Sequence, residues 1–318
     1  MFTKLIVNTY KRALLTRHDP DGAIFYFSHT DFEGIECETF EFFGERGQRL
    51  QGYFYTKNVT RPDRLVIFEH GMGCGHRAYM SEIATLVEHG YTVFAYDHTG
   101  TLNSGGEHIG GFTQSLCDLD SAIKALKASG RCDGKRLAVI GHSWGGFSTM
   151  NIGAFHKDIT HLVAMSGFVS PNKIITDMLG KMKKYAPAVF ASEVAYFGGY
   201  AYADASLSLL QTDARALIIH SKDDPTVPYS RFLELEASLG DVERISFLPL
   251  EGKRHNPNYT ADAVRYKDEF FAELTRFRKK SKKATEEEKR EFASRWDWHR
   301  MTEQDADFWA KIFDFIDG

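Results

Sequence analysis

The stretch Leu137-Ala-Val-Ile-Gly-His-Ser-Trp-Gly-Gly146 decides the fold, because an apolar segment leads directly into the pattern G-x-S-x-G. This pattern is typical of a strand, a tight turn and a helix, in which Gly141 and Gly145 leave room for backbone to pass close by. We expect the hydroxyl of Ser143 to project above the sheet at the N-terminus of a helix over 144–155, where free N–H groups favour negative charge. The pattern alone arises by chance in about one chain of this length in ten. The prediction therefore depends on the apolar residues before it and the helical periodicity after it.

The composition fits one large domain with a small-molecule substrate. The chain has 318 residues, of which 43% are hydrophobic, and this is enough for a sizeable core. A net charge of −4 without a domain-wide basic face argues against a nucleic-acid partner. No apolar run reaches the roughly 18 residues of a membrane span, and the N-terminal stretch lacks the apolar region of a signal peptide. We therefore expect a cytoplasmic protein.

The cysteines indicate neither disulfides nor a metal site. Cys37, Cys74, Cys117 and Cys132 show no paired spacing, and four scattered cysteines in a chain of this length are typical of reduced, structural thiols. No bound cofactor or metal ion is expected. A homo-oligomer is compatible with the sequence, which does not specify the oligomeric state.

The order of predicted elements gives the fold class. We expect a short amphipathic helix over 1–16 and antiparallel strands at 23–29, 36–43 and 49–57. From Arg64 onward, short apolar runs alternate with helical segments. The predicted strands are 65–68, 92–96, 137–140, 162–165, 216–219 and 245–248, and the predicted helices are 77–89, 114–129, 144–155 and 229–239. Alternation of this kind predicts an α/β fold, a mostly parallel twisted sheet with helices on both faces and reactive groups at the carboxyl ends of the strands.

A first irregular interval, about 168–213, is too long for a simple connection and is predicted to be a small helical cap within a single domain, 1–318. It is rich in aromatic residues and methionine, which either line a lid over an acyl or aromatic group or pack the cap onto the body. These residues are Met178, Met182, Tyr185, Phe190, Tyr196, Phe197, Tyr200 and Tyr202.

A second interval, about 257–300, is predicted to be a C-terminal helical insertion, with a helix around 260–278 and a last helix at 302–316 after it. Thr285 with Glu288, and Thr302 with Asp305, are spaced as capping boxes at helix N-termini. The basic run from Arg276 to Lys283 is either a solvated face or a contact for an anionic ligand or membrane surface.

A serine nucleophile needs a histidine base and an acid, and both follow later predicted strands. The segment HSKDDPTVP comes after 216–219, and EGKRHNP comes after 245–248. We favour Asp224 over Asp223 as the acid, because Pro225 keeps the residue before it extended. His255 is the candidate base, and the order serine, acid, histidine is the one expected for this type of fold.

Two backbone amides are candidates for an oxyanion hole. One is the N–H of Trp144, directly after the serine, and the other is the N–H of Met72 in the glycine-rich loop after the first parallel strand. For His70, His98 and His142 we expect hydrogen bonds that shape loops rather than proton transfer.

Taken together, these segments resemble the α/β-hydrolase superfamily over roughly Arg49 to His255. The matching segments are HGMG (70–73) for the oxyanion loop, YDHTGTLNSGG (96–106) for the usual D-x-x-G-x-G-x-S-x-G, GHSWGG (141–146) for the elbow, IIHSKDDPTVP (218–228) for the acid and EGKRHNP (251–257) for the histidine. The likeness is greatest to bacterial serine esterases and to hydrolases of the dienelactone-hydrolase or peptidase type. Ser221 stands where that acid loop usually has glycine, Thr101-Leu102-Asn103 departs from the glycine pattern after Gly100, and 257–300 intervenes before the last helix.

The resemblance implies a serine hydrolase that cleaves carboxylic esters of small molecules through an acyl-enzyme on Ser143, His255 and Asp224. Thioester or amide hydrolysis, including peptidase activity, and acyl transfer remain alternatives on the same triad. A dinucleotide enzyme is the main rival, but the third glycine position of G-x-G-x-x-G counted from Gly71 is His76. A non-catalytic binding protein on the same scaffold would be expected to have a damaged triad.

Overall fold

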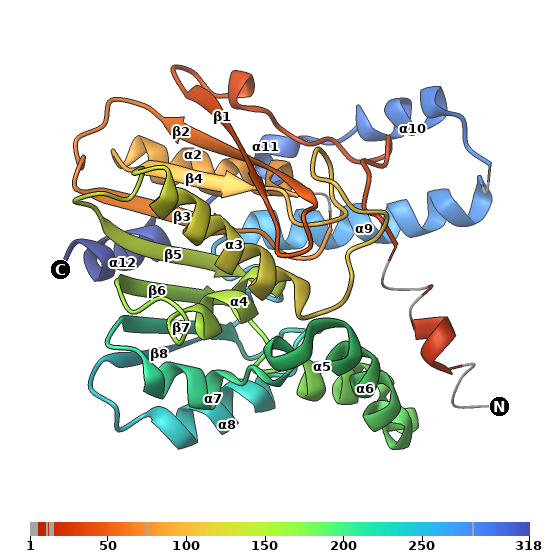
Figure 1. Ribbon diagram of the computed structural model, residues 1–318. Helices are drawn as coiled ribbons and strands as arrows, with labels where there is room; N and C mark the ends of the chain where they lie inside the picture. Colours follow the sequence, from red (N-terminus) through yellow and green to blue (C-terminus); the bar gives the residue numbers. More distant parts are fainter. Residues whose placement is uncertain (1–5, 11, 13–15, 74, 282) are drawn as a thin grey trace.

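One eight-stranded sheet forms the centre of the molecule (Figure 1). The computed structural model describes residues 6–10, 12, 16–73, 75–281 and 283–318. The strand order is β1-β2-β4-β3-β5-β6-β7-β8. The strands are β1 (Glu36–Phe43), β2 (Arg49–Thr56), β3 (Arg64–Glu69), β4 (Thr92–Tyr96), β5 (Arg136–His142), β6 (Ile159–Met165), β7 (Arg215–Ser221) and β8 (Ile245–Leu250). β2 is antiparallel to β1 and β4, and all other neighbours are parallel, as the sequence predicts.

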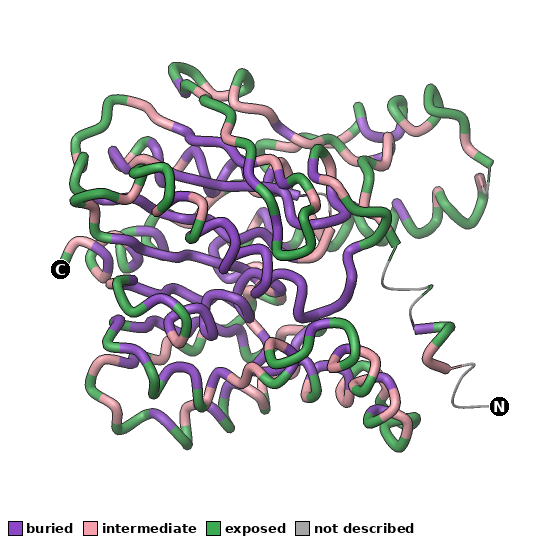
Figure 2. Tube along the Cα trace, in the orientation of Figure 1, coloured by how far each residue is buried: buried purple, intermediate pink, exposed green. Residues whose placement is uncertain are grey.

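Helices cover both faces of the sheet, because its central strands are apolar on both sides. Ile67 of β3 faces the core under α3 and α4, whereas Val66 and Phe68 face the core under α2 and α12. Figure 2 shows the buried strands between these two layers. The helices are α2 (Met80–Glu88), α3 (Gln114–Ala128), α4 (Trp144–Ile152), α8 (Tyr229–Leu239) and α12 (Ala306–Asp317), and two short 3-10 helices, η1 (His29–Asp31) and η2 (His76–Tyr79), precede them.

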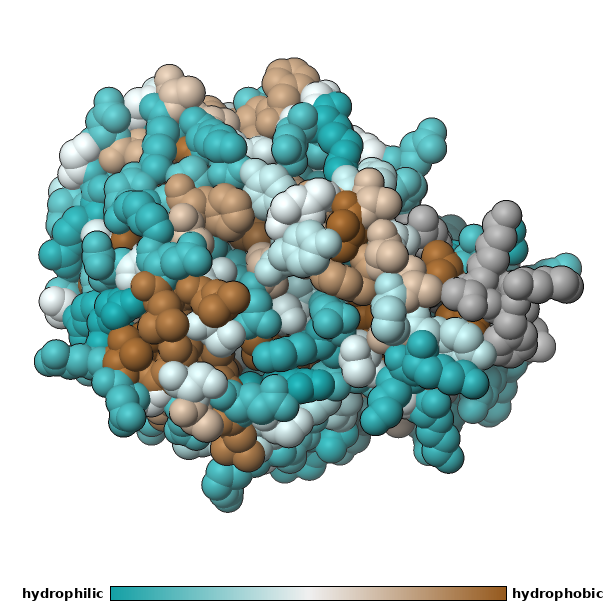
Figure 3. Space-filling view, turned by 60° about the horizontal axis from the view of Figure 1, so that its bottom comes forward, coloured by the Kyte–Doolittle hydropathy of each residue, from teal (hydrophilic) through white to brown (hydrophobic). Residues whose placement is uncertain are grey.

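The interval between β6 and β7 is helical and lies at one end of the sheet. It comprises α5 (Pro171–Leu179), η3 (Gly180–Tyr185), α6 (Ala186–Phe197), η4 (Gly198–Tyr202), α7 (Ala205–Ser208) and η5 (Leu209–Gln211). Phe190 and Tyr200 pack against the core, whereas Met178, Met182 and Tyr202 are exposed by 49%, 49% and 65%. Hydrophobic side chains also gather on the surface on the side where Figure 1 places α7 and α8 (Figure 3).

The C-terminal insertion consists of α9 (Ala261–Lys280), α10 (Glu286–Ala293) and α11 (Trp298–Met301), which share a small core of their own. Phe270 and Phe292 meet Ala23 of the N-terminal segment in this core. The capping box of Thr285 and Glu288 is confirmed.

Thr302 was expected to begin the last helix, and this expectation is wrong. Thr302 is the C-cap of α11, and its hydroxyl donates to the carbonyl of Trp298, the first residue of that helix. Asp305 is the N-cap of α12 and accepts from the Phe308 amide. The sequence alone allows either Thr302 or Asp305 as the N-cap of the last helix. The hydrogen bond between the hydroxyls of Ser81 and Thr302 holds Thr302 at the C-terminal end of α11.

The strand expected at 23–29 is also absent: the segment is irregular. The carbonyls of Tyr26 and Phe27 accept hydrogen bonds from the Arg77 guanidinium at 2.6 and 2.9 Å instead of from a neighbouring strand. Their apolar neighbour Phe25 contacts Trp298. The alternation of this segment therefore reflects packing against the C-terminal insertion.

The helix expected over 1–16 lies largely outside the described residues, and of it 6–10 and 12 are helical. Cys37, Cys117 and Cys132 are free thiols, and Cys74 lies outside the described residues. None of the helices in the described part of the chain combines the length and the apolar character that crossing a membrane requires.

Candidate active site

Ser143 occupies the strained turn between β5 and α4. Its φ of 56° and ψ of −110° lie in a region that side-chain-bearing residues rarely adopt. A Cβ at Gly141 would lie 2.2 Å from the carbonyl oxygen of Gly145, and one at Gly145 would lie 2.2 Å from that of Glu69. The glycines on either side of Ser143 are therefore required for the backbone to make this turn, as the sequence predicts.

Three loops at the carboxyl ends of β5, β7 and β8 bring the predicted residues together. His255 Nε2 lies 2.9 Å from Ser143 Oγ, and His255 Nδ1 lies 2.7 Å from Asp224 Oδ2. The Asp224 side chain is fully buried, and that of His255 is 19% exposed. A hydroxyl, an imidazole and a carboxylate thus form one continuous chain of hydrogen bonds.

The two adjacent aspartates have different surroundings. Asp224 Oδ1 accepts from the amides of Thr226 and Val227 at 2.7 and 3.1 Å. Burial alone would raise the pKa of Asp224, but the hydrogen bond and charge of His255, with these amides, lower it below its usual value. Asp223 points elsewhere and accepts from the Ser221 hydroxyl at 2.5 Å. The acid beside His255 is therefore ionised Asp224.

His142, directly before the serine, supports the loop that carries His255. Its Nε2 lies 2.6 Å from the His255 carbonyl oxygen, and its Nδ1 lies 2.8 Å from the Tyr79 hydroxyl. Burial and the charge of His255 lower the pKa of His142 to about 3, so its ring is neutral. Because a carbonyl can only accept, Nε2 carries the proton and Nδ1 accepts from Tyr79. This is a loop-shaping role, as expected for His142.

The glycine-rich loop after β3 passes directly beside Ser143. A Cβ at Gly71 would lie 3.3 Å from the Cβ of Ser143, so the next residue, Met72, is next to the serine and lines the same cavity. Trp144 is the first residue of α4, and its N–H has no partner within the helix. In the described part of the chain, neither the Met72 nor the Trp144 amide donates a backbone hydrogen bond.

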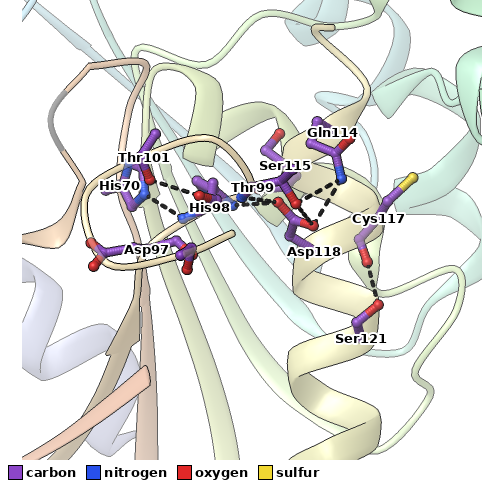
Figure 4. Close-up of polar contacts among 12 residues, drawn as sticks. His70, Asp97, His98, Thr99, Thr101, Gln114, Ser115, Cys117, Asp118 and Ser121 are labelled. Carbon is purple, nitrogen blue, oxygen red and sulfur yellow. Dashed lines mark hydrogen bonds and ion pairs between the residues drawn. The ribbon is translucent and has the colours of Figure 1, made fainter. Parts of the chain in front are cut away.

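A buried cluster of charged side chains lies beneath this loop (Figure 4). The His98 ring lies 3.5 Å from both Glu69 and Asp118, and all three side chains are fully buried. Burial by itself would lower the pKa of His98, but the two carboxylates outweigh it and raise that pKa above its usual value. For Glu69, burial is the largest effect and raises the pKa to about 7. His70 Nε2 accepts from the His98 amide at 3.1 Å and its Nδ1 donates to the Gly71 carbonyl at 2.7 Å. The cluster therefore fixes the start of the glycine-rich loop.

Two neighbouring cavities lie at this site, and the first of them includes Ser143. The first, of about 350 Å³, is lined by Ser143, His255 and residues of α9. The second, of about 230 Å³, is mainly apolar and lies between the N-terminal segment, the glycine-rich loop, α9 and α11. Both are lined by the same five residues, Met72, Tyr79, Asn256, Lys267 and Phe271.

The walls of these cavities were not predicted from the sequence. Of the described residues in 168–213, none lines either cavity, so the aromatic residues of that interval do not form this wall. Lys267 and Phe271 of α9 lie there instead, with Phe25 and Phe27 in the second cavity. The only signal in the sequence is the helical spacing of Lys267 and Phe271, and it does not show what that helix contacts.

The described residues include no group of three or more His, Cys, Asp or Glu side chains that could hold a metal ion. The buried Asp97, which a dinucleotide enzyme would use for a ribose, instead accepts from His76 Nδ1 at 2.7 Å. The chemistry that the arrangement supports is nucleophilic attack by a serine hydroxyl with an imidazole as its base.

Comparison with known proteins places the fold. Residues 60–202, somewhat less than half of the chain, match the family model of serine aminopeptidases, S33. An esterase from Pyrococcus furiosus has a similar structure (TM-score 0.60, 19% identity, covering 83% of this chain and 98% of that one). So does an α/β hydrolase from a Penicillium species (TM-score 0.54, 17% identity, 77% and 98%). An acylaminoacyl peptidase from Pyrococcus horikoshii matches over 72% of this chain and 38% of its own (TM-score 0.54, 16% identity). No curated protein sequence matches the chain.

Proposed function

We propose that the chain is a serine hydrolase of the α/β-hydrolase superfamily that cleaves carboxylic esters of small molecules. The observation that carries the proposal is the continuous hydrogen-bonded chain from Ser143 through His255 to buried Asp224. This arrangement suits a serine that attacks an acyl carbon.

In the first half of the reaction, His255 Nε2 takes the proton of Ser143 while Oγ forms a bond to the ester carbonyl carbon. The carbonyl oxygen becomes an oxyanion, which the amides of Met72 and Trp144 are proposed to bind. The carbon–oxygen bond to the alcohol then breaks, and His255 gives its proton to the departing alcohol. Asp224 holds the ring in position and stabilises its positive charge.

In the second half, water attacks the acyl carbon of the acyl-enzyme, and His255 takes the proton of that water. The bond from the acyl carbon to Ser143 breaks, the serine regains its proton and the carboxylic acid leaves. The net reaction consumes one ester and one water and yields one acid and one alcohol.

The charges around the first cavity favour an ester over an aminopeptidase substrate. An aminopeptidase needs a negative group to bind the free α-amino group of its substrate. Asp268 lines the cavity, but Arg254 pairs with it at 3.3 Å, and Lys267 adds a further positive charge. Thioester hydrolysis and acyl transfer use the same three residues, and substrate comparison separates them.

Intact-mass labelling with a fluorophosphonate tests the proposal. We expect one label per wild-type chain, none on Ser143→Ala, and full labelling of Ser238→Ala, a control at an exposed serine of α8. A panel of aryl esters, matching thioesters and aminoacyl amides should then show the highest kcat/KM for the esters. If wild type takes up no label and cleaves no ester, the proposal is wrong.

A further inference from the structure

One cation lies at the junction of the two cavities beside Ser143. Of the five residues that line both, Lys267 alone has a charged side chain. It extends from α9, and its ammonium nitrogen lies 4.6 Å from the centre of the Tyr259 ring. Tyr259 itself is buried and lines the second cavity.

The Lys267 ammonium has no anionic partner of its own. Within the described residues it takes part in no ion pair or hydrogen bond. Two acidic residues are near enough to influence it. Asp268 is paired with Arg254, and Glu82, whose pKa burial raises, accepts from the Asn258 amide at 2.9 Å and forms no ion pair with Lys267 in the described structure. Burial lowers the pKa of Lys267 to about 8 even though both carboxylates oppose this, so the ammonium is charged at neutral pH but poorly compensated.

A charge in this position is costly unless something binds to it. A partly buried ammonium without a counter-ion is unfavourable, whereas a long-chain hydrophobic residue would fill the same place at no such cost. The remaining wall of the second cavity is largely aromatic, with Phe25, Phe27 and Trp298. The combined site thus has one ammonium without an ion-paired partner next to an apolar pocket. Of the two guanidinium groups that also line it, Arg254 pairs with Asp268 and Arg77 donates to the Tyr26 and Phe27 carbonyls.

We propose that Lys267 binds a carboxylate of the substrate, so that the preferred substrates are esters that carry a carboxylate together with an apolar chain or ring. This inference rests on the proposed ester hydrolysis at Ser143. A carboxylate suits the site better than a phosphate, because a single ammonium offers one charge and three donors, whereas phosphate sites usually combine several donors. The same charge would disfavour substrates with a free amine.

The test compares esters that differ only in charge. On the acyl side, the mono-4-nitrophenyl esters of dicarboxylic acids with four to eight carbons are each paired with the corresponding methyl, 4-nitrophenyl diester. On the alcohol side, 4-carboxyphenyl hexanoate is paired with its methyl ester. For wild type we expect kcat/KM to be about tenfold or more higher for the charged member in at least one series.

The variants assign this preference to Lys267. In Lys267→Met, which keeps the length of the side chain, we expect the charged-to-neutral ratio of kcat/KM to fall at least tenfold, mainly through KM. Lys267→Arg should keep part of the ratio, and Lys279→Met, an exposed lysine on the same helix, should keep all of it. Each variant is tested on the same substrate pair, so differences in leaving-group reactivity cancel when the charged-to-neutral ratios of kcat/KM are compared between variants.

The outcomes separate the two proposals. If wild type cleaves neutral esters but shows no preference for charged ones, or if Lys267→Met keeps the wild-type ratio, the role of Lys267 is overturned while ester hydrolysis stands. If wild type cleaves no ester and takes up no fluorophosphonate, ester hydrolysis itself fails. Should Lys267→Met not fold, wild type is treated with two alkyl fluorophosphonates that differ only in a terminal carboxylate or its methyl ester. Faster labelling by the carboxylate then supports the proposal, and equal rates overturn it.

Discussion

His142 and His255 are linked through a backbone carbonyl, with His142 Nε2 donating to the His255 oxygen at 2.6 Å. The residue before the proposed nucleophile therefore holds the loop of the proposed base. Tyr79 donates to the other nitrogen of the His142 ring, at 2.8 Å. Because burial and the charge of His255 lower the pKa of His142 to about 3, this link persists across the working range of pH.

Replacing His142 by phenylalanine should impair turnover more than binding. The variant keeps a ring of similar size but leaves the His255 carbonyl and the Tyr79 hydroxyl without their partner. We expect kcat to fall by about ten- to a hundredfold with KM changed by less than about threefold, because the base is misplaced while the cavity remains. Steady-state kinetics with one neutral ester measures both values. Tyr79→Phe removes only the outer hydrogen bond and should have a smaller effect; an unchanged kcat in His142→Phe would exclude this positioning role.

The neighbouring aspartates offer a matched pair of substitutions. Asp224→Asn should lower kcat by about a thousandfold or more, because the amide cannot stabilise the His255 imidazolium and favours the wrong tautomer. Asp223→Asn should cost less than about tenfold, since this carboxylate binds the Ser221 hydroxyl and not the histidine. Circular dichroism of both variants confirms that they fold. Equal losses in the two variants would contradict the assignment of Asp224 as the acid.

Gly145→Ala should destabilise the fold, because its Cβ would lie 2.2 Å from the backbone oxygen of Glu69. Since backbone has to move to accommodate it, we expect the free energy of unfolding in urea to fall by about 2–4 kcal/mol. At Gly199, a Cβ would meet no atom within 4 Å, and its φ is not in the left-handed region. Gly199→Ala should therefore be neutral or slightly stabilising, and a Gly145→Ala variant as stable as this control would refute the close approach.

Glu69→Gln should change how stability depends on pH. Burial raises the pKa of Glu69 from 4.5 to about 7, so between these values the folded protein keeps a proton that the unfolded chain has lost. This group thus contributes stability below about pH 4.5 that disappears as the pH rises through about 7. Wild type should therefore lose stability between pH 5 and pH 8 that Glu69→Gln does not lose. The free energy of unfolding of the variant should rise relative to that of wild type over this range. Parallel profiles in urea titrations would show that Glu69 is ionised normally.

The parts of the site that sequence could predict are those with local causes. The elbow at Ser143 follows from two glycines and an apolar strand, and the loops of Asp224 and His255 follow strands whose carboxyl ends must lie at one edge of a parallel sheet. Strand and helix bounds agree within a few residues for the same reason, since buried parallel strands are continuous apolar runs.

What the sequence could not predict depends on contacts between distant segments. The alternation of 23–29 suggested a strand, but its carbonyls bind Arg77 and its aromatic side chains pack against the C-terminal insertion. The aromatic residues of 168–213 were natural candidates for a pocket wall, yet α9 takes that place beside Ser143. Neither Lys267 nor Tyr79 belongs to a recognisable motif, because their importance comes only from what the fold places next to them.

The division of this site between two parts of the chain has an evolutionary consequence. The proposed catalytic residues are on loops of the sheet, whereas much of the wall that would contact the rest of a substrate comes from α9, α11 and the segment around Phe25. Mutations in that wall can accumulate without disturbing the elbow or the histidine. Substitutions in this wall can therefore change which compounds fit the site, while the residues proposed to carry out the reaction stay the same.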